Sequence, residues 1–384
     1  MKSTDRSTIK SAVRGVAQIV ETDRGLKFSR LPEWTYPQHS HAPIVAKMAE
    51  RLSGARIDIE TSGSEVVVTY RSTRDSNPAF NWAAGPTTFA LTAPGFEQSV
   101  SHTNGDLRVW DGLEIKETIT GEDSVATFRL PETNEPRPIQ LWLSQDSPSE
   151  LISIEVNAPW IAAPKTSQPN WVHYGSSISH CEDADGPLGV WPVAASRALG
   201  LDLYNLSLGG CANLEQYSAR TIRDLDADVI SLKLGINVVN GANHTERTFG
   251  PAVDGFIDTI REGHPAAPIL VISPVCCPGH ETNPGPSETL ADGKVVGQQF
   301  GRHEWIGELT LQSIRVQLKN LVERRASTDP NIFYMDGLEL FNEVEAQTMP
   351  DGIHPDADGY KTIAKHFVER YPKQWLAEKW GAGK

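Results

Sequence analysis

Long apolar runs are missing from this sequence, and so is an excess of positive charge. No stretch approaches the roughly 20 apolar residues that a helix needs to cross a bilayer, and the N-terminal segment has no continuous apolar core of the signal-peptide kind. Lys and Arg number 35 against 49 Asp and Glu, so the net charge of −14 opposes the phosphates of nucleic acids and anionic lipids. These features argue against nucleic acid and membrane as partners, and they predict a cytoplasmic protein.

Cysteine is also scarce, and the common cofactor motifs are missing. The four cysteines are Cys181, Cys211, Cys276 and Cys277. Their number and spacing suit neither a disulfide scaffold nor a paired zinc site, so we expect free thiols. There is no HExxH, no Walker loop and no G-x-G-x-x-G, and the Asp-rich stretches 183–186 and 356–359 lack the further ligands of a calcium loop. We therefore expect no metal and no cofactor.

The first part of the chain has the pattern of a β-sandwich. A length of 384 residues exceeds what one hydrophobic core usually organises, so two domains are expected. Between residues 55 and 157, short β-branched and aromatic runs alternate with clusters of Gly, Pro, Asn, Asp and Ser. The runs are ARIDIE, EVVVTYR, TFALT, LRVWDG, VATFRL, IQLWLS and LISIEV. We predict an antiparallel, jelly-roll-like sandwich over residues 1–165, with one short helix within 42–54.

The second part, residues 166–384, alternates apolar runs with helical stretches. The predicted strands are WVHYG, LDLYNLSL, DVISLKLG, PILVISPV and NIFYMDG, each apolar enough to be buried on both faces. Helices are expected over 191–199 and 249–263, ending at Gly200 and Gly263 as left-handed caps. One apolar stripe of the second helix is assigned to the core: Phe249, Val253, Phe256, Ile257 and Ile260. This pattern predicts an α/β domain with a parallel sheet between two helical layers.

Four short motifs follow predicted strands of this second domain. They are Gly175-Ser176-Ser177-Ile178, Leu208-Gly209-Gly210, Gly235-Ile236-Asn237 and Asp351-Gly352-Ile353-His354-Pro355. Ligands of open α/β sheets bind outside the carboxyl ends of the strands, so these segments are expected to meet at one edge. A serine, a histidine and an aspartate gathered there are the parts of a nucleophilic hydrolase, because serine needs a base and the base needs an orienting carboxylate.

In their order and residue types, the four motifs resemble the four blocks of the SGNH/GDSL hydrolase family. The resemblance implies an SGNH-type three-layer α/β/α domain that acts as a serine esterase. Carried over residue by residue, it implies Ser177 as nucleophile, His354 as base and Asp351 as the residue that orients it. It also implies an oxyanion hole formed by Ser177, Gly210 and Asn237. The β-rich first part is similar in general character to a sandwich that accompanies some of these esterases.

Two positions depart from the family pattern. Ser176 stands where the first block has Asp, and Val238 stands where the third block has Asp after the Asn. Each motif also has a purely structural interpretation when taken alone. Serines cap turns, glycine pairs permit tight turns, and an asparagine bonds within a loop.

The resemblance supports the type of reaction better than the substrate. We expect hydrolysis of a small acyl ester, with acetyl the leading acyl group, on a carbohydrate or another small molecule. An acyltransferase with the same residues is the alternative, and an inactive carbohydrate-binding protein is the alternative from another class. The long polar segment 276–303 is a potential substrate lid. Whether Trp34, Trp110 or Trp191 offers a sugar platform stays open, as does the oligomeric state.

Overall fold

The computed structural model describes residues 2–3, 5–80, 82–112, 114–298, 303 and 305–380. The chain divides into two compact units. The first comprises Met1–Ser167 and Asp185–Leu188, and the second comprises Gln168–Ala184 and Gly189–Lys384. The boundary expected from the sequence was between residues 165 and 166.

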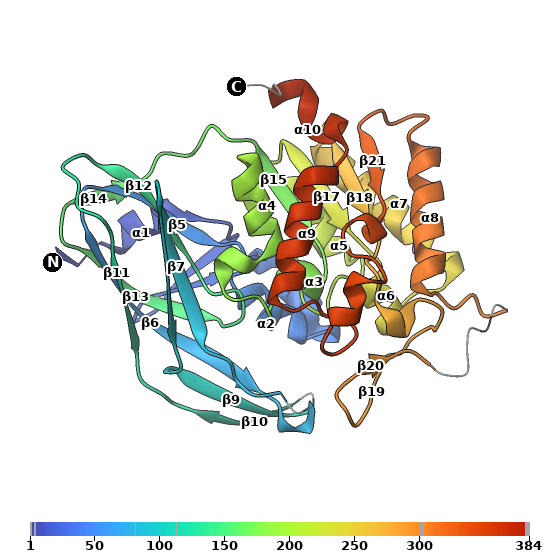
Figure 1. Ribbon diagram of the computed structural model, residues 1–384, viewed down its shortest axis with the longest axis horizontal. Coiled ribbons are helices and arrows are strands. Elements are labelled where there is room, and N and C mark those ends of the chain that lie inside the picture. The colour runs from blue at the N-terminus through green and yellow to red at the C-terminus, as the bar shows by residue number, and fades with distance from the viewer. Residues whose placement is uncertain are drawn as a thin grey trace. The chain divides into compact units, whose positions relative to one another are not determined.

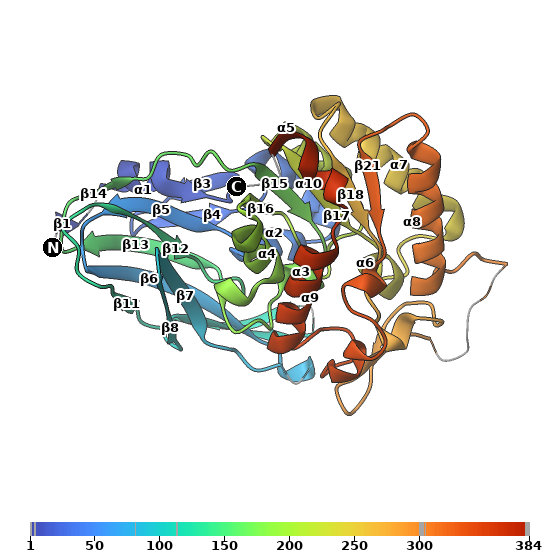
Figure 2. The ribbon, with the colours of Figure 1, turned by 45° about the horizontal axis from the view of Figure 1, so that its top comes forward.

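Two sheets form the first unit (Figures 1 and 2). The larger has the order β10-β9-β6-β13-β4-β3, with β1 and β11 paired off this path, and the smaller has the order β14-β5-β12-β7-β8, with β2 on β5. The strands of the larger sheet are β1 (Lys2–Ser3), β3 (Gln18–Glu21), β4 (Leu26–Ser29), β6 (Glu65–Ser76), β9 (Asp106–Asp111), β10 (Glu114–Ile119), β11 (Ser124–Arg129) and β13 (Ser149–Val156). Those of the smaller are β2 (Val13–Arg14), β5 (Arg56–Thr61), β7 (Thr87–Ala93), β8 (Phe96–His102), β12 (Arg137–Trp142) and β14 (Trp160–Ala162).

Alternation along the strands builds the core of this unit. In β6, Val66, Val68 and Tyr70 are buried and the intervening residues are less so, as expected when successive side chains point to opposite faces. Tyr70 stacks on Phe89 of β7, with ring centroids 4.2 Å apart. The seven predicted runs are all strands. The sandwich is not wholly antiparallel, however, because β6 pairs with β9 in parallel.

Helical segments of the first unit were only partly anticipated. They are α1 (Arg6–Ala12), the 3₁₀ segments η1 (Glu33–His41) and η2 (Pro78–Phe80), and α2 (Ile44–Glu50). The expected helix within 42–54 is α2, which ends at Glu50. The segment η1 was not expected, because its Pro37 interrupts any helical periodicity.

The second unit is built on a five-stranded parallel sheet in the order β16-β15-β17-β18-β21. Its strands are β15 (Asn170–Tyr174), β16 (Asp202–Asn205), β17 (Val229–Lys233), β18 (Ile269–Ile272) and β21 (Ile332–Met335). Each lies within one of the predicted apolar runs, apart from Asn170 at the start of β15. Every residue of β17 and β18 is buried, as expected for central parallel strands; β18 is wholly apolar, whereas β17 also buries Ser231 and Lys233.

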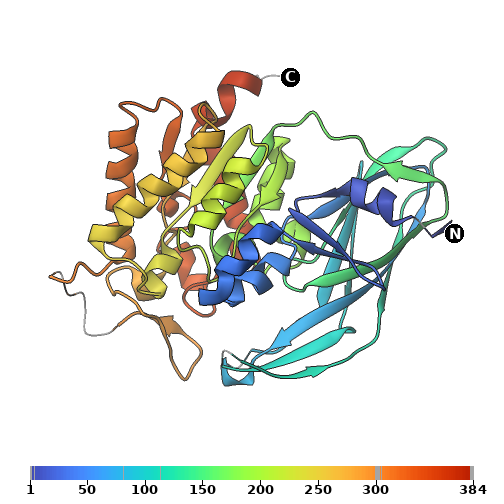
Figure 3. The same cartoon turned by 180° about the vertical axis from the view of Figure 1, so that it is seen from behind.

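Helices cover both faces of this sheet. On one face lie α4 (Trp191–Leu199) and α9 (Ala357–Arg370), and on the other lie α5 (Gln216–Asp224) and α7 (Glu246–Gly263), which Figure 3 shows from behind. α8 (Leu311–Arg325) contacts β21 and α7. The shorter helices are α3 (Ser177–His180), α6 (Ile236–Asn240) and α10 (Lys373–Trp380). The predicted fold class, an α/β domain with a parallel sheet preceded in the chain by a β-sandwich, is confirmed.

The two predicted glycine caps had different outcomes. Gly200 caps α4 in the left-handed conformation, with φ of 66°, as expected. Gly263 was wrongly assigned as a cap: it is the last residue of α7, and His264 follows as the cap. A Cβ at Gly263 would lie 2.2 Å from the carbonyl oxygen of Arg223 in α5, so this position needs glycine for close packing. The predicted stripe of α7 is fully buried.

Candidate active site

Ser177 lies directly beyond the carboxyl end of β15, at the first position of α3. The Ser176 side chain accepts a hydrogen bond of 3.3 Å from the N–H of Ile178, and thereby caps this short helix. Gly175 is required by close packing, because a Cβ there would lie 2.7 Å from Oγ of Ser179. Ser176, which departs from the family pattern, thus stabilises the turn that carries Ser177.

Ser177, His354 and Asp351 form one hydrogen-bonded chain. Oγ of Ser177 lies 2.8 Å from Nε2 of His354, and Nδ1 of His354 lies 2.6 Å from Oδ2 of Asp351. The other carboxylate oxygen, Oδ1, accepts bonds from the N–H groups of Ile353 (2.9 Å) and His354 (2.7 Å). Asp351 therefore fixes both the imidazole and the backbone that bears it.

The opposite charges of Asp351 and His354 shift the pKa values of both groups. Burial opposes ionisation of Asp351, but hydrogen bonds from His354 and its positive charge lower the pKa of Asp351 to about 2. Burial likewise opposes protonation of His354. The bond to Asp351, that carboxylate's charge and the nearby charges of Asp183 and Glu182 outweigh burial and raise the pKa of His354 above its ordinary value. The imidazole is about a third exposed, which leaves it open to a substrate.

Gly210 and Asn237 each present a donor that no other described group uses. Gly210 has φ of +69°, the left-handed region that glycine tolerates best, and its N–H makes no hydrogen bond among the residues described. Oδ1 of Asn237 accepts a bond of 3.0 Å from the N–H of Ala212, which leaves the amide nitrogen to donate. Val238, the second departure from the family pattern, is buried in the core.

Hydrogen bonds join all four sequence motifs at the carboxyl edge of the sheet. Leu208 donates to the carbonyl of Gly175 (2.9 Å), which ties the second motif to the first. The bond from Ala212 to Asn237 ties the second to the third, and the bond between Ser177 and His354 ties the first to the fourth. The structure therefore brings together the motifs that carry the predicted site residues.

Glu215 supports the loop after Gly210, and sequence reasoning missed it. Its carboxylate accepts bonds from the N–H of Asn213 (3.0 Å) and from the hydroxyl of Tyr174 (3.3 Å). Burial raises the pKa of Glu215 above its ordinary value. A lone glutamate one residue before a helix has no sequence signature that distinguishes it from a solvent-exposed one.

The segment 276–303 is tied to the loops that carry the candidate site. It contains the short hairpin of β19 (Glu288–Thr289) and β20 (Val295–Val296). The N–H of Val295 donates to the carbonyl of Asp351 (2.8 Å), and the N–H of Ser287 donates to the carbonyl of Asn240 at the end of α6 (2.8 Å). Through these bonds, the described part of the segment (residues 276–298 and 303) supports the third and fourth motifs. Its role as a substrate lid stays a prediction.

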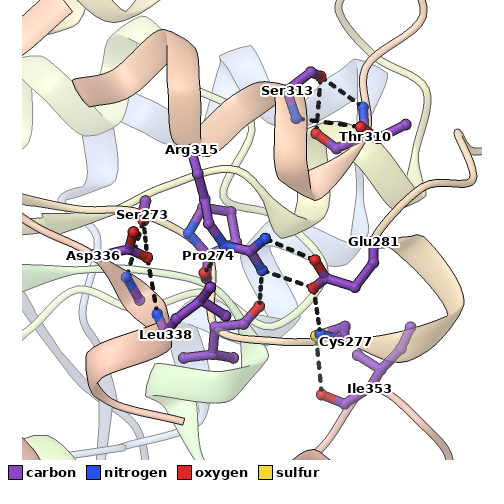
Figure 4. Close-up of polar contacts among 12 residues, drawn as sticks. Ser273, Pro274, Cys277, Glu281, Thr310, Ser313, Arg315, Asp336, Leu338 and Ile353 are labelled. Atoms are coloured by element: carbon purple, nitrogen blue, oxygen red, sulfur yellow. Dashed lines mark hydrogen bonds and ion pairs between the residues drawn. The ribbon is translucent and has the colours of Figure 1, made fainter. Parts of the chain in front are cut away.

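A buried ion pair anchors the start of this segment (Figure 4). Arg315 of α8 reaches Glu281 through two bonds of 2.7 Å, and it also donates to the carbonyls of Pro274 (3.0 Å) and Val275 (3.1 Å). Glu281 in turn accepts from the N–H of Cys277 (3.2 Å), whose thiol lies 3.7 Å from the carbonyl oxygen of Ile353. This chain of contacts ends one residue before His354.

The four cysteines are free and buried, as expected for thiols. Burial, together with the nearby charge of Glu215, raises the pKa of Cys211 to about 12, so its thiolate is disfavoured. Lys233, the last residue of β17, was not singled out from the sequence. It is 3% exposed, and burial lowers its pKa to about 8.

Other expectations concern tryptophans, metals and membranes. Of the three tryptophans, Trp110 (8% exposed) and Trp191 (0%) are buried, so only Trp34, at 42%, could offer a ring to a sugar.

Asp356 of the second Asp-rich stretch caps α9 by accepting from the N–H of Gly359 (2.8 Å). Within the described residues, no group of three or more His, Cys, Asp or Glu side chains is placed to hold a metal ion. No described helix has the length and apolar character to cross a bilayer.

Comparison with known proteins assigns the second unit to a family. The model of the GDSL-like lipase/acylhydrolase family matches residues 173–362. No curated protein matches the chain. Among solved structures, the salicylyl-acyltransferase SsfX3 of a tetracycline biosynthetic pathway is similar at 25% identity, with 92% of each chain covered and a TM-score of 0.73.

Two less identical structures share the fold across nearly the whole chain. One is a family two carbohydrate esterase from Clostridium thermocellum, solved with cellohexaose: 12% identity, 93% of this chain and 97% of that chain covered, TM-score 0.58. The other is the acetyl xylan esterase Est2A from Butyrivibrio proteoclasticus: 14% identity, 98% and 99% covered, TM-score 0.53. The family resemblance and the assignment as an ester hydrolase are confirmed. Residues 173–362 form a domain of the GDSL-like lipase/acylhydrolase family, and the protein is a serine hydrolase of the SGNH type that acts on carboxylic esters.

Proposed function

We propose that the protein hydrolyses a small acyl ester through an acyl-enzyme on Ser177. The observation that carries this proposal is the chain of contacts from Ser177 to His354 (2.8 Å) and from His354 to Asp351 (2.6 Å). A serine hydroxyl becomes an effective nucleophile when an adjacent imidazole accepts its proton and a carboxylate holds that imidazole in the correct tautomer.

The reaction proceeds in two halves on these groups. Oγ of Ser177 attacks the ester carbonyl while its proton passes to Nε2 of His354. The negative oxygen that develops is stabilised by the N–H groups of Ser177 and Gly210 and by the amide of Asn237. His354 then gives its proton to the leaving alcohol, and the acyl group stays on Ser177. A water molecule, deprotonated by His354, releases the acid and restores the serine.

An acetyl ester of a carbohydrate is the first substrate to test. The fold is shared with an acetyl xylan esterase and a carbohydrate esterase, which supports this choice without deciding it. Turnover of p-nitrophenyl esters of increasing acyl length gives the acyl preference, and acetylated xylan or cello-oligosaccharides test the alcohol part. We expect the highest kcat/KM with acetyl. A maximum at longer acyl chains would contradict the acetyl assignment.

Covalent labelling tests the nucleophile and separates an enzyme from an inactive binding protein. A fluorophosphonate should add one phosphonyl group to the wild-type chain, as seen by intact-protein mass, and none to Ser177→Ala. His354→Ala should label far more slowly, because no base remains to take the serine proton. Labelling that persists in Ser177→Ala would show that another residue is the nucleophile. A wild-type protein that neither labels nor turns over esters would favour the carbohydrate-binding alternative.

Acyl transfer is a second candidate function, favoured by one specific observation. The salicylyl-acyltransferase SsfX3 is similar over 92% of the chain at 25% identity. The same acyl-enzyme would be resolved by an alcohol in place of water. Product analysis in the presence of acceptor alcohols distinguishes the two reactions. Ester products that exceed the free acid at millimolar acceptor would identify a transferase.

The cytoplasmic location stays a proposal. It is supported by the four free thiols, which persist most readily in a reducing compartment. Fractionation of the native producing cell, with a cytoplasmic and an exported marker, tests it. Recovery of the protein with the exported marker would overturn it.

A further inference from the structure

The first unit contains a cavity that the ester chemistry does not use. Its volume is about 520 Å³, within the range of small-molecule sites. The sheet residues that line it include Lys27 of β4, Arg71 of β6, Arg108 of β9 and Glu150 of β13. Tyr36 of η1 and Glu50 of α2 contribute from the two helical segments.

The cavity lies on the outward face of the larger sheet, the face that points away from the sandwich core. Arg71 and Thr73 alternate with Tyr70 and Ser72, and Tyr70 belongs to the sandwich core. Glu150 is the cross-strand partner of Arg71, so both side chains project to the same side. The cavity is therefore not a packing defect of the core, since it lies on the opposite face of the sheet and carries polar side chains.

Of the three cations in the lining, Arg71 and Arg108 are already paired with carboxylates. Arg71 donates to Asp106 (3.0 Å) and Asp123 (2.7 Å). Arg108 makes two bonds of 2.8 Å to Asp75. An anionic ligand would compete with these carboxylates for the two guanidinium groups. The lining thus disfavours a phosphate or a carboxylate as the ligand.

The carboxylate of Glu50 belongs to the lining and has no protein partner among the described residues. Among the residues that the structure describes, its carboxylate forms no hydrogen bond and no ion pair. Glu50 is half-buried, and this burial raises the pKa of its carboxyl group above the ordinary value. Its carboxylate oxygens are therefore free to accept hydrogen bonds from the hydroxyls of a ligand in the cavity. Tyr36 adds an aromatic ring and a hydroxyl to the same cavity.

We propose that this cavity binds a neutral, hydroxyl-rich ligand, namely a saccharide of one or two rings. Hydroxyls can donate to Glu50 and Glu150 and accept from Lys27 and Arg71, without disturbing the existing ion pairs. Few lining residues are apolar, chiefly Val20, Phe28 and Pro148, which disfavours a lipid. The proposal does not rest on the esterase mechanism, because binding in the first unit needs no turnover.

Calorimetric titration of the full-length Ser177→Ala protein tests the proposal without hydrolysis. The probes are glucose, cellobiose and xylobiose, with putrescine and inorganic phosphate for the cationic and anionic alternatives. We expect at least one saccharide to bind, and neither ion. Heat from putrescine or phosphate alone, or no heat from any saccharide at millimolar concentration, would overturn the proposal.

Variants locate the binding in this cavity. Glu50→Leu removes the unpaired carboxylate, and Thr73→Trp fills the outward face of β6; each should weaken saccharide binding by about tenfold or more. Glu117→Leu is the matched control, since Glu117 is exposed on β10 and does not line the cavity. In the wild-type background, all three should keep the rate of p-nitrophenyl acetate hydrolysis. Saccharide binding that survives both cavity variants would place the ligand elsewhere and overturn the assignment.

Discussion

Asn237 has two roles, one in holding a loop and one in donating to the oxyanion, and substitution by alanine removes both at once. Its Oδ1 holds the loop after Gly210 by accepting from Ala212 (3.0 Å), and its amide nitrogen is left to donate to the developing oxyanion. We predict that Asn237→Ala lowers kcat by about 10²- to 10³-fold, the usual cost of losing one oxyanion-hole donor, with little change in KM.

The variant Asn237→Asp separates the two functions. It keeps an acceptor for Ala212 but has no amide donor, so its kcat should fall at least as far as that of Asn237→Ala. Steady-state kinetics and thermal melting of both variants check this. If Asn237→Asp kept the wild-type kcat, Asn237 would be a loop residue only.

The pH dependence of the reaction depends on the pair formed by His354 and Asp351. His354 acts as a base only when neutral, and Asp351 raises the pKa of its imidazole above the ordinary value. The rate should therefore fall as the pH drops through a value above about 6.5, the ordinary histidine pKa. Removing the carboxylate charge in Asp351→Asn should move this limb to lower pH and lower the maximal rate.

Profiles of kcat/KM against pH for the two proteins measure this displacement. Ser177→Ala provides the background rate at each pH, and circular dichroism shows that the variants stay folded. An acid limb at the same pH in wild type and Asp351→Asn would mean that Asp351 does not control the titration of the base.

At the scale of elements, α8 is coupled to the catalytic loops through Arg315. The guanidinium and the Glu281 carboxylate are both largely buried, with side chains 8% and 15% exposed. Losing one partner of a buried pair leaves the other uncompensated, so Arg315→Met should lower the free energy of unfolding by about 3–5 kcal/mol. The double variant Arg315→Met/Glu281→Leu should recover part of this loss.

Arg324 offers a matched control on the same helix. It pairs with Asp254, but its side chain is 63% exposed, so Arg324→Met should cost under about 1 kcal/mol. Urea denaturation of the four proteins gives the comparison. Equal losses for Arg315→Met and Arg324→Met would show that the Glu281 anchor contributes no more than a surface pair.

Substitution by alanine should have opposite effects on stability at two glycines of α7, Gly255 and Gly263. A Cβ at Gly263 would lie 2.2 Å from the backbone oxygen of Arg223, whereas a Cβ at Gly255 would meet nothing within 4 Å. Gly263→Ala should therefore destabilise the protein by about 1–3 kcal/mol through overpacking. Gly255→Ala should stabilise it by about 0.5–1 kcal/mol, because alanine favours the helix.

Thermal melting of the two alanine variants checks the pair. A gain of stability in both would mean that α5 and α7 separate easily at Gly263. A loss in both would mean that Gly255 is constrained by something other than space.

At the scale of the whole molecule, the proposed chemistry uses only side chains and backbone of the chain itself. Ser177, His354 and Asp351 supply nucleophile, base and orienting carboxylate, and the oxyanion donors are amides. Exhaustive dialysis against EDTA should therefore leave kcat/KM unchanged. Loss of activity that zinc or calcium restores would assign a metal role to one of the Asp-rich stretches.

Much of the fold could be predicted from the sequence because its signals are local. The strands β17 and β18 are buried on both faces, so their sequences are largely apolar. The helix α7 is buried along one stripe, so its apolar residues from Phe249 to Ile260 recur at helical spacing. Alternation likewise predicted β6 and its neighbours. The motifs that carry Ser177, Gly210, Asn237 and His354 could be found because each is recognisable within a few residues and their order resembles that of a known family.

Tertiary packing alone decided the remaining features. The parallel pairing of β6 with β9, the close approach of Gly263 to Arg223, and the anchor from Arg315 to Glu281 each join residues that are distant in the chain. The cavity beside Glu50 also needs strands and helical segments from several parts of the first unit. By itself, the sequence determined which segments form strands and helices and which motifs carry the chemistry, since both depend on neighbouring residues. Which side chains meet depends on how the sheets and helices pack, and only the tertiary structure contains that information.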